Sequence, residues 1–320
     1  MNKNNQSLKQ KFGRIGVLMG GDSSEREISL KSGEAVYNSL KENGMDVVAI
    51  DIKNTADKTR LKDEILREKI DVAFIALHGV FGEDGQIQAF LEELEIPYTG
   101  SDTAASGLAM DKIASKKIFE SNGILSPKFI VAAEPDFNCN TLRFPVVVKP
   151  CDGGSSIGLS IVKNEKDFKD AFLFAAKYSD RIILEEYQQG KEITVGILDD
   201  KPLPVVMIKP KEEFYNYKAK YSKGLTEYLV PAPLDFKTTK LCQETALKAH
   251  RALGLSCFSR IDMILKDDKT PVVLEANSIP GMTTLSLLPK AALEGGLSFC
   301  ELCIKIIESA LDKKSILLKK

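Results

Sequence analysis

Residues 260–277 read Arg260-Ile-Asp-Met-Ile-Leu-Lys-Asp-Asp-Lys-Thr-Pro-Val-Val-Leu-Glu-Ala-Asn277. Polar and apolar residues alternate in two runs, and a polar segment at residues 267–270 separates them. This pattern predicts two antiparallel β-strands joined by a turn, because successive side chains of a strand point to opposite faces of a sheet. The polar positions of both runs then share one face of the hairpin.

Centring the turn just after Asp268 places Asp262 opposite Glu275 and Arg260 opposite Asn277. The other face is apolar, with the pairs Ile261–Ala276, Met263–Leu274 and Leu265–Val272. Opposed carboxylates need a positive charge between them. Two interpretations remain open at this point. Arg260 supplies that charge in a structural ion cluster, or the carboxylates and the Asn277 amide oxygen bind a hard cation such as Mg²⁺.

A glycine- and serine-rich loop follows the apolar strand that ends at Lys149. Its backbone N–H groups and hydroxyls belong to Gly153, Gly154, Ser155, Ser156 and Gly158. Such a loop can bind phosphate, with the lysine as a point charge, although it lacks the spacing of a Walker A loop. A glycine-rich hairpin turn is the alternative. Further along, the polar loop Lys209 to Lys223 interleaves tyrosines with Lys220, which predicts either a lid over phosphate or a plain surface loop.

The first hundred residues alternate strands with helices. Strands are expected at residues 14–19, 46–50 and 72–77, and helices after Ser24, at 57–69 and at 86–94. This order predicts a doubly wound parallel α/β sheet, whose ligand-binding edge lies at the carboxyl ends of the strands. Ser24 and Glu27 have the spacing of a capping box. Gly20, Gly21, Glu25 and His78 all follow strands, so they are expected at that edge.

The remaining chain predicts α+β structure. We expect helices at residues 104–121, 165–178 and 236–253 and at the end of the chain, and strands at 128–132, 144–149, 181–186 and 192–198. The Cys300–Cys303 pair has a redox-like spacing but lies in an apolar helical pattern, which favours core packing over a redox or zinc site.

Composition excludes several classes of protein. A chain of 320 residues exceeds one hydrophobic core, so two or three domains are expected. A net charge of −1 makes nucleic acid a poor partner, and no apolar run approaches the ~20 residues of a membrane span. The first residues carry no secretory signal pattern, so the six cysteines are expected to be reduced in a cytoplasmic protein.

Together these segments resemble the ATP-grasp superfamily and, within it, the D-alanine–D-alanine ligase family. The matching segments occur in the family's order and are Gly20–Ser29, Ala76–Gly79, Gly82–Gly85, Pro97–Ser101, Met110–Lys112, Lys149–Gly158, Tyr217–Tyr221, Arg260–Asp262 and Leu274–Thr283. The resemblance implies a three-domain fold. Its domains are an N-terminal α/β substrate domain at 1–100, a central α+β domain with the phosphate loop at 101–187, and a C-terminal domain with the lid and the metal-binding hairpin at 188–320.

The resemblance also implies ATP, two Mg²⁺ ions (Mn²⁺ being an alternative metal) and two molecules of D-alanine as ligands. ATP-binding roles fall on Lys112, Lys149, Ser155, Ser156, Glu185, Glu186, Tyr187, Glu192 and Lys220. Metal-binding roles fall on Asp262, Glu275 and Asn277. Substrate-binding roles fall on Glu25, His78, Arg260, Gly281, Ser286 and Leu287, and catalytic roles on Glu25, Ser155, Tyr221, Arg260 and Gly281.

The family's reaction condenses two D-alanines through a D-alanyl phosphate for peptidoglycan synthesis. No residue in the sequence is an obvious base for the attacking amine. In related D-alanine–D-lactate ligases the loop usually lacks the tyrosine found at Tyr221, so its presence favours an amine nucleophile. A homodimer that forms through the first domain is a further expectation. The alternatives are an ATP-grasp ligase for another amino or hydroxy acid, and a catalytically silent ATP-binding protein.

Overall fold

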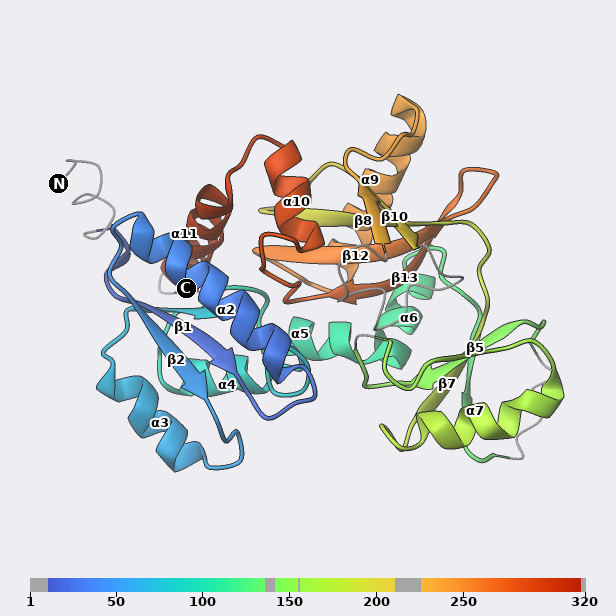
Figure 1. The fold of residues 1–320 in the computed structure, drawn as a ribbon, viewed down its shortest axis with the longest axis horizontal. Helices are drawn as coiled ribbons and strands as arrows, with labels where there is room; N and C mark the ends of the chain where they lie inside the picture. Colours follow the sequence, from blue (N-terminus) through green and yellow to red (C-terminus); the bar gives the residue numbers. More distant parts are fainter. Residues whose placement is uncertain (1–10, 136–141, 155, 211–225, 318–320) are drawn as a thin grey trace.

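The computed structural model describes residues 11–135, 142–154, 156–210 and 226–317, and side chains as far as residue 312. Three sheets organise these residues. A parallel sheet lies at one end of the molecule, a four-stranded antiparallel sheet lies at the other, and the largest sheet lies between them (Figure 1). No helix of the described residues is long and apolar enough to cross a membrane.

The N-terminal sheet is parallel, with strand order β2-β1-β3, as the sequence predicts. Its strands are β1 (Ile15–Gly20), β2 (Val47–Ile52) and β3 (Val72–Ile75), and its helices are α2 (Arg26–Glu42), α3 (Lys58–Arg67) and α4 (Gln86–Glu93). The apolar face of β1 and β3 forms one core with the C-terminal helices α10 (Leu287–Glu294) and α11 (Phe299–Leu317). Cys303 is buried in that core, and Cys300 packs against it, as a free thiol in both cases, which confirms the packing interpretation of the C-x-x-C pair.

The predicted capping box at Ser24 and Glu27 is wrong. Helix α2 begins at Arg26, and its N-cap residue Glu25 makes no side-chain capping bond. The preceding turn is held instead by Ser23, whose hydroxyl accepts from the Glu25 N–H at 3.2 Å and donates to the His78 carbonyl at 2.8 Å. The bond to the His78 carbonyl ties the start of α2 to the segment that follows β3.

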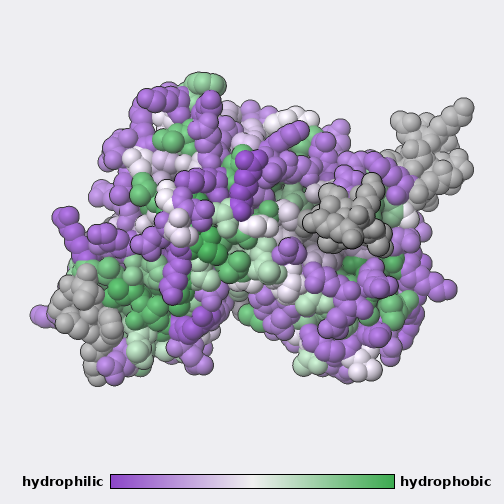
Figure 2. Space-filling view, turned by 180° about the vertical axis from the view of Figure 1, so that it is seen from behind, coloured by the Kyte–Doolittle hydropathy of each residue, from purple (hydrophilic) through white to green (hydrophobic). Residues whose placement is uncertain are grey.

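The central sheet is antiparallel, with strand order β4-β7-β5-β6. It consists of β4 (Phe129–Ala132), β5 (Val146–Pro150), β6 (Ser160–Val162) and β7 (Ile182–Glu186). The predicted helix at 165–178 is a 3-10 turn (Glu165–Asp167) followed by α7 (Phe168–Ala175), which packs on one face of the sheet. Seen from behind, most of the surface is hydrophilic, and hydrophobic residues gather over this lobe (Figure 2). Its exposed large hydrophobic side chains include Val131, Leu173, Phe174 and Tyr178.

The predicted helix at 104–121 is in fact two helices, α5 (Thr103–Met110) and α6 (Lys112–Ser121). Asp111 separates them, because its ψ of 103° leaves the helical region. Its carboxylate then accepts hydrogen bonds from the N–H groups of Ile113 and Ala114, which caps α6. The break redirects the chain, so that Lys112 starts a new helix.

The largest sheet has the strand order β11-β10-β8-β12-β13, with β9 paired to β8. Its strands are β8 (Lys191–Leu198), β9 (Lys201–Pro202), β10 (Val206–Pro210), β11 (Thr226–Leu229), β12 (Phe258–Leu265) and β13 (Pro271–Asn277). Helix α9 (Phe236–Ala252) packs on one face together with residues of α5 and α6. The predicted β12–β13 hairpin therefore exists, and it forms one side of the molecule's main cavity.

Candidate active site

A cavity of about 590 Å³ lies between the central sheet and the largest sheet. Strands β5 and β7 supply one wall, strands β8, β10, β12 and β13 supply the other, and the glycine-rich loop borders it. Many residues singled out from the sequence line this cavity, namely Lys112, Lys149, Ser156, Glu185, Glu186, Tyr187, Glu192, Asp262 and Glu275. Both hairpin carboxylates thus reach one cavity from one sheet face, as the predicted register requires.

Three of the predicted site residues cannot be placed. Ser155, Lys220 and Tyr221 lie outside the described residues, as does most of the predicted lid after Pro210. Their roles stay predictions.

Two lysines and a glutamate form a buried group, here called the lysine cluster: Lys116, Lys149 and Glu185. Lys149 lies near the end of β5 and Glu185 near the end of the neighbouring β7, while Lys116 comes from α6. The Nζ atoms of Lys116 and Lys149 lie 3.1 and 3.0 Å from the same Oε1 atom of Glu185. The cluster therefore carries one net positive charge at the central wall of the cavity.

The pKa values of the three side chains in the lysine cluster are shifted by burial and by one another's charges. Burial lowers the pKa of Lys116 to about 8, although the Glu185 charge opposes this shift. Burial would lower the pKa of Lys149 too, but the charges of Glu185 and Glu275 raise it above the usual value. Burial alone would raise the pKa of Glu185, and the two lysine charges hold it below its usual range. All three groups are thus charged at neutral pH.

At the opposite wall lies a second charged group, here called the hairpin cluster: Arg260, Asp262, Glu275 and Asn277. Asp262 and Glu275 line the cavity, whereas Arg260 and Asn277 are not part of its lining. Asp262 pairs with Glu275 and Arg260 with Asn277, which confirms the predicted register. Arg260 donates to both Asp262 oxygens, from Nε at 2.8 Å and from Nη2 at 2.7 Å. Asn277 Nδ2 donates to Asp262 Oδ2 at 3.1 Å, and Thr194 on β8 donates to Oδ1 at 2.6 Å. Asp262 is therefore fixed from three directions.

The register beyond Asp262 differs from the prediction. Met263 pairs with Val273 rather than Leu274, and Leu265 pairs with Pro271 rather than Val272, because the register shifts by one residue at this point. A bulge of this kind gives one strand an extra residue and turns a side chain to the other face. Consequently the successive residues Leu274 and Glu275 both line the cavity. Strict alternation of polar and apolar residues cannot predict that two successive residues face the same cavity.

The donor chemistry of the hairpin cluster fits Mg²⁺ or Mn²⁺. Two carboxylates and an amide bring only oxygen donors to one face of the hairpin, and such donors suit hard cations. Positive groups already stand beside both acids: the Arg260 guanidinium is bound to Asp262, and Lys112 Nζ lies 3.8 Å from Glu275 Oε2. In this structure Arg260 and Lys112 therefore compensate the two acids, as the ion-cluster interpretation predicts for Asp262, and the metal-binding role of these residues stays a proposal.

The N-terminal domain contributes the buried residues Glu25 and His78, at 8% and 5% exposure. The Nε2 atom of His78 lies 3.0 Å from the hydroxyl of Ser32, and Nδ1 lies 3.3 Å from Glu83 Oε1. Burial raises the pKa of Glu83, which the hydrogen bond to His78 and the charge of Arg260 oppose. The charge of Glu25 raises it further. The charge of Arg260 therefore acts on Glu83, so the hairpin cluster and the N-terminal domain interact electrostatically.

Two loops meet the N-terminal domain at this point. A Cβ atom on Gly154 would lie 3.0 Å from Glu25 Oε2, so the glycine-rich loop touches Glu25. After β13, the Met282 N–H donates to Ser32 Oγ at 3.2 Å. The predicted residues of this second loop are therefore close by: Gly281 precedes Met282, Ser286 occupies the N-cap position of α10, and Leu287 begins that helix. Ser286 Oγ accepts from the Thr283 N–H at 3.1 Å, which shapes the loop.

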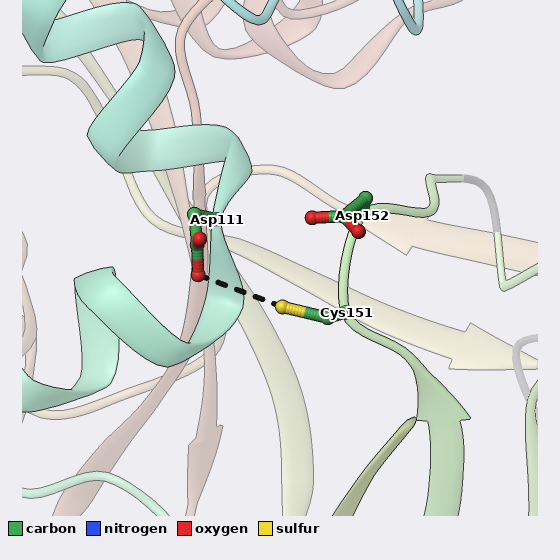
Figure 3. Close-up of side chains that lie close together, drawn as sticks. All are labelled: Asp111, Cys151 and Asp152. Atoms are coloured by element: carbon green, nitrogen blue, oxygen red, sulfur yellow. Dashed lines mark hydrogen bonds between the residues drawn. The ribbon is translucent and has the colours of Figure 1, made fainter. Parts of the chain in front are cut away.

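A group of potential metal ligands lies beside the loop, but its contacts indicate a structural role. Asp111, Cys151 and Asp152 bring one ligand atom each within 4.8 Å of one another (Figure 3). Arg181 already neutralises them, since Nη1 donates to Asp111 Oδ2 at 2.9 Å and Nη2 donates to Asp152. Burial raises the pKa of the Cys151 thiol to about 11, so it stays protonated and donates to Asp111. These contacts join the start of α6 to the end of β5.

Sequence reasoning missed four residues that the structure brings to the site: Ser32, Glu83, Lys116 and Thr194. A signal existed for Lys116, which follows Lys112 by one helical turn and so shares its face of α6. Glu83 lies within the matched Gly82–Gly85 segment. Ser32 and Thr194 gave no signal, because each acts through a contact distant in the sequence.

Comparisons with known proteins agree with this geometry. Residues 14–64 and 53–101 match the family model described as "D-ala D-ala ligase N-terminus". Residues 118–308 match the model described as "D-ala D-ala ligase C-terminus". Together the two models span the parallel sheet, the glycine-rich loop and both walls of the cavity.

Relatives match over nearly the whole chain. The D-alanine–D-alanine ligase of Geotalea uraniireducens is 45% identical over 305 residues, which cover 94% of this chain and 97% of that protein. The crystal structure of the Bacillus anthracis D-alanine–D-alanine ligase complexed with ATP has a TM-score of 0.83 at 36% identity, over 95% of this chain and 99% of that one. The VanG D-Ala:D-Ser ligase of Enterococcus faecalis has a TM-score of 0.78 at 29% identity, over 93% and 99%. This chain therefore belongs to the D-alanine–D-alanine ligase family.

Proposed function

We propose that the chain is a D-alanine–D-alanine ligase, which uses ATP to join two D-alanine molecules for peptidoglycan synthesis. One observation carries the proposal. A single cavity has a net positive lysine cluster at one wall and two acids on the other, and Gly154 in its lining lies beside the buried Glu25 of the N-terminal domain. Such a cavity suits a triphosphate with its metal, next to a small amino acid.

ATP occupies the cavity between the two sheets. Lys112 and Lys149 contact the phosphates, and the N–H groups of the glycine-rich loop around Ser155 and Ser156 cradle them. The adenine lies along the segment from Glu185 to Tyr187, which contacts it partly through the backbone. The ribose hydroxyls bind Glu192, and Lys220 reaches the γ-phosphate.

Asp262, Glu275 and Asn277 hold two Mg²⁺ ions, and Mn²⁺ suits the same oxygen donors. When bound, these ions neutralise the charge that develops on the phosphates during transfer. Lys112 shares this task on the chain's side, since it lies 3.8 Å from Glu275 and borders the same cavity.

The first D-alanine binds beside Glu25 and His78, and its carboxylate points towards the γ-phosphate. A carboxylate oxygen forms a bond to the γ-phosphorus as the bond to ADP breaks, which yields D-alanyl phosphate and ADP. Activation is required because a carboxylate is a poor electrophile. The acyl phosphate hydrolyses in water, so the reaction requires that water be excluded. The sequence predicts this task for the segment Lys209 to Lys223, most of which lies outside the described residues.

The second D-alanine binds with its carboxylate at Ser286 and Leu287, where the N-terminus of α10 favours an anion. Its neutral amine attacks the activated carbonyl, and phosphate leaves. Arg260 and the Gly281 N–H stabilise the oxyanion of this step. Among the described residues, no hydrogen bond occupies the Gly281 N–H. Glu25, Ser155 and Tyr221 orient the substrates or pass on the amine's proton.

The test measures ADP release with D-alanine, L-alanine, D-lactate, D-serine or no second substrate, and identifies each product by mass. We expect ADP release that depends on D-alanine and gives D-alanyl-D-alanine. Preference for D-lactate or D-serine would assign the chain to an ATP-grasp ligase for another amino or hydroxy acid. Absence of turnover despite ATP binding would leave a silent ATP-binding protein.

Two properties of the whole protein complete the proposal. Because the reaction consumes ATP, we place the enzyme in the cytoplasm. We also expect two chains to associate through their N-terminal domains, which sedimentation equilibrium tests directly. A monomer at all concentrations would contradict the dimer without affecting the proposed reaction.

A further inference from the structure

Lys116 is a charged side chain in an unusual position. It is 0% exposed, and it does not belong to the lining of the cavity, although its partners Glu185 and Lys149 do. Its Nζ atom lies between Glu185 Oε1, at 3.1 Å, and the ring of Phe129, whose centroid is 6.0 Å away. Lys116 therefore cannot contact a ligand in the cavity, yet it contacts a group that does.

Burying this lysine is costly. Taking a charge out of water is unfavourable, and buried ion pairs are often no more stable than apolar residues of similar volume. An apolar side chain would fill the same space below the sheet more cheaply. Folding alone therefore gives no reason for a charge at this position.

The charge balance of the lysine cluster supplies a reason. Lys149 and Glu185 carry opposite charges, and their charged atoms are 3.0 Å apart. Without Lys116 they would therefore form a pair with no net charge. A neutral pair exerts little attraction on a distant anion. With Lys116 bound to the same Glu185 oxygen, the carboxylate is compensated from behind, and a net positive charge remains on the cavity side.

We propose that Lys116 is a positioning residue for ATP, which neutralises Glu185 from beneath the cavity so that the charge of Lys149 acts on the phosphates. The inference rests on the proposed function only for the identity of the nucleotide. Its consequence is that the effect of Lys116 increases with the charge of the ligand. A residue that merely supports the fold would affect charged and uncharged ligands alike.

The experiment compares the binding of ATP and adenosine, without D-alanine, by calorimetry. In Lys116→Met we expect ATP binding to weaken about tenfold, as loss of one charge within a protein interior implies, and adenosine binding to change less than about twofold. Lys117→Met, on the exposed side of the same helix, is the matched control and should bind both ligands as the wild type does.

A second variant separates charge from packing. The double substitution Lys116→Met with Glu185→Gln removes one charge of each sign, so Lys149 again acts alone. We expect its ratio of ATP affinity to adenosine affinity to return to within about threefold of the wild-type ratio, because the net charge of the cluster is restored. A contact of Glu185 with adenine is lost for both ligands, so it cancels in this ratio. Glu185→Gln alone keeps an acceptor oxygen and removes only the negative charge, so it should not lower the ratio of ATP affinity to adenosine affinity. This arm remains informative if Lys116→Met does not fold, and a lowered ratio would contradict the inference.

Equal losses for ATP and adenosine in Lys116→Met would overturn the inference, and so would a double variant whose ratio of ATP affinity to adenosine affinity is no higher than that of the single one. Failure of the proposed function is a separate result: the wild type would then bind ATP but release no ADP with D-alanine. The affinity of each variant for ATP and adenosine is measured without D-alanine, so it does not depend on that reaction.

Discussion

The lysine cluster and the hairpin cluster face one cavity, but they differ in charge and in origin. Two lysines and one glutamate leave the first cluster with a positive charge, whereas the two acids and one arginine of the second leave it negative. The hairpin cluster comes from two adjacent strands, β12 and β13. The lysine cluster comes from α6, β5 and β7, which are far apart in the sequence.

This difference in charge indicates which part of the ligand each wall binds. A triphosphate needs positive charge, and the metal that accompanies it needs negative charge. Placing most of these charges on opposite walls leaves the cavity between them for the ligand, although Glu275 still raises the pKa of Lys149. Lys112 is the point of contact between the two walls, since it lies beside Glu275 and bonds to the carbonyl of Gly153 in the loop.

The comparison is tested most strongly at Asp262. Asp262→Asn removes a proposed metal ligand and leaves Arg260 without its carboxylate partner. We expect the rate of D-alanine-dependent ADP release to fall about a hundred- to thousandfold, as when one electrostatic contact to a developing charge is lost. Binding of adenosine should be unchanged.

Asp267→Asn is the matched control, because Asp267 is exposed in the turn of the same hairpin. It removes an equal charge without touching the cavity. An equal loss of rate in both variants would mean that overall charge, rather than the hairpin cluster, governs the reaction.

The lysine cluster is tested through the pH dependence of stability. Burial lowers the pKa of Lys116 from 10.5 to about 8. The charge of Glu185 opposes this shift, and the charge of Lys149 adds to it. Between these values the unfolded chain holds a proton that the folded chain has released, so the free energy of unfolding rises with pH. We expect a rise of about 3 kcal/mol, at about 1.4 kcal/mol per pKa unit.

Urea denaturation of the wild type and of Lys116→Met between pH 7.5 and 10.5 measures this rise. The difference between the two proteins reports on the lysine cluster, because the titrating groups outside the cluster are common to both. Parallel pH profiles would show that Lys116 is not the buried cation described here.

The sequence sufficed where interactions are local. Asp262 and Glu275 oppose each other in a hairpin whose alternation is visible, so their shared face followed from the residues alone. The parallel N-terminal sheet followed from alternating strands and helices. Resemblance to the family added the residues outside the hairpin, and the structure places most of those it describes around one cavity.

The sequence was insufficient where packing overrides a local pattern. The bulge that brings Leu274 beside Glu275 breaks the alternation, and no residue there announces it. Asp111 interrupts a continuous helical pattern because its carboxylate caps the following helix. Lys116 joins Lys149 and Glu185 only after two strands and a helix pack together, so the lysine cluster has no signature in a single segment.

The glycine-rich loop is the next test, since it connects the two walls to the N-terminal domain. A Cβ atom on Gly154 would lie 3.0 Å from Glu25 Oε2, whereas one on Gly153 would make ordinary contacts with the Pro150 side chain at 3.4 Å and the Ile157 carbonyl oxygen at 3.8 Å. Gly154→Ala should therefore displace the loop and lower kcat/KM for D-alanine about tenfold, a cost of about 1.4 kcal/mol. Gly153→Ala should lower it less than about threefold. Steady-state kinetics would contradict the contact if the order were reversed.

The smallest expected effect concerns Arg181, which lies outside both clusters. It joins Asp111 at the start of α6 to Asp152 at the end of β5, and it thereby links the elements that carry Lys112, Lys116 and Lys149. Because its side chain is 48% exposed, water screens these ion pairs and their contribution is small. We expect Arg181→Gln to raise the KM for ATP about two- to threefold with kcat unchanged, since only the placement of the phosphate-binding lysines is relaxed.

Arg251→Gln is the matched control for Arg181, because Arg251 is also exposed and pairs with Asp200, and neither residue lines the cavity. It should leave both constants unchanged. If Arg181→Gln instead abolished ATP binding, the outer ion pairs would determine where the lysine cluster lies. The buried contacts of Glu185 would then be insufficient to position Lys149. The difference between the clusters would be larger, because the hairpin cluster is formed by two paired strands whereas the lysine cluster would also depend on exposed ion pairs.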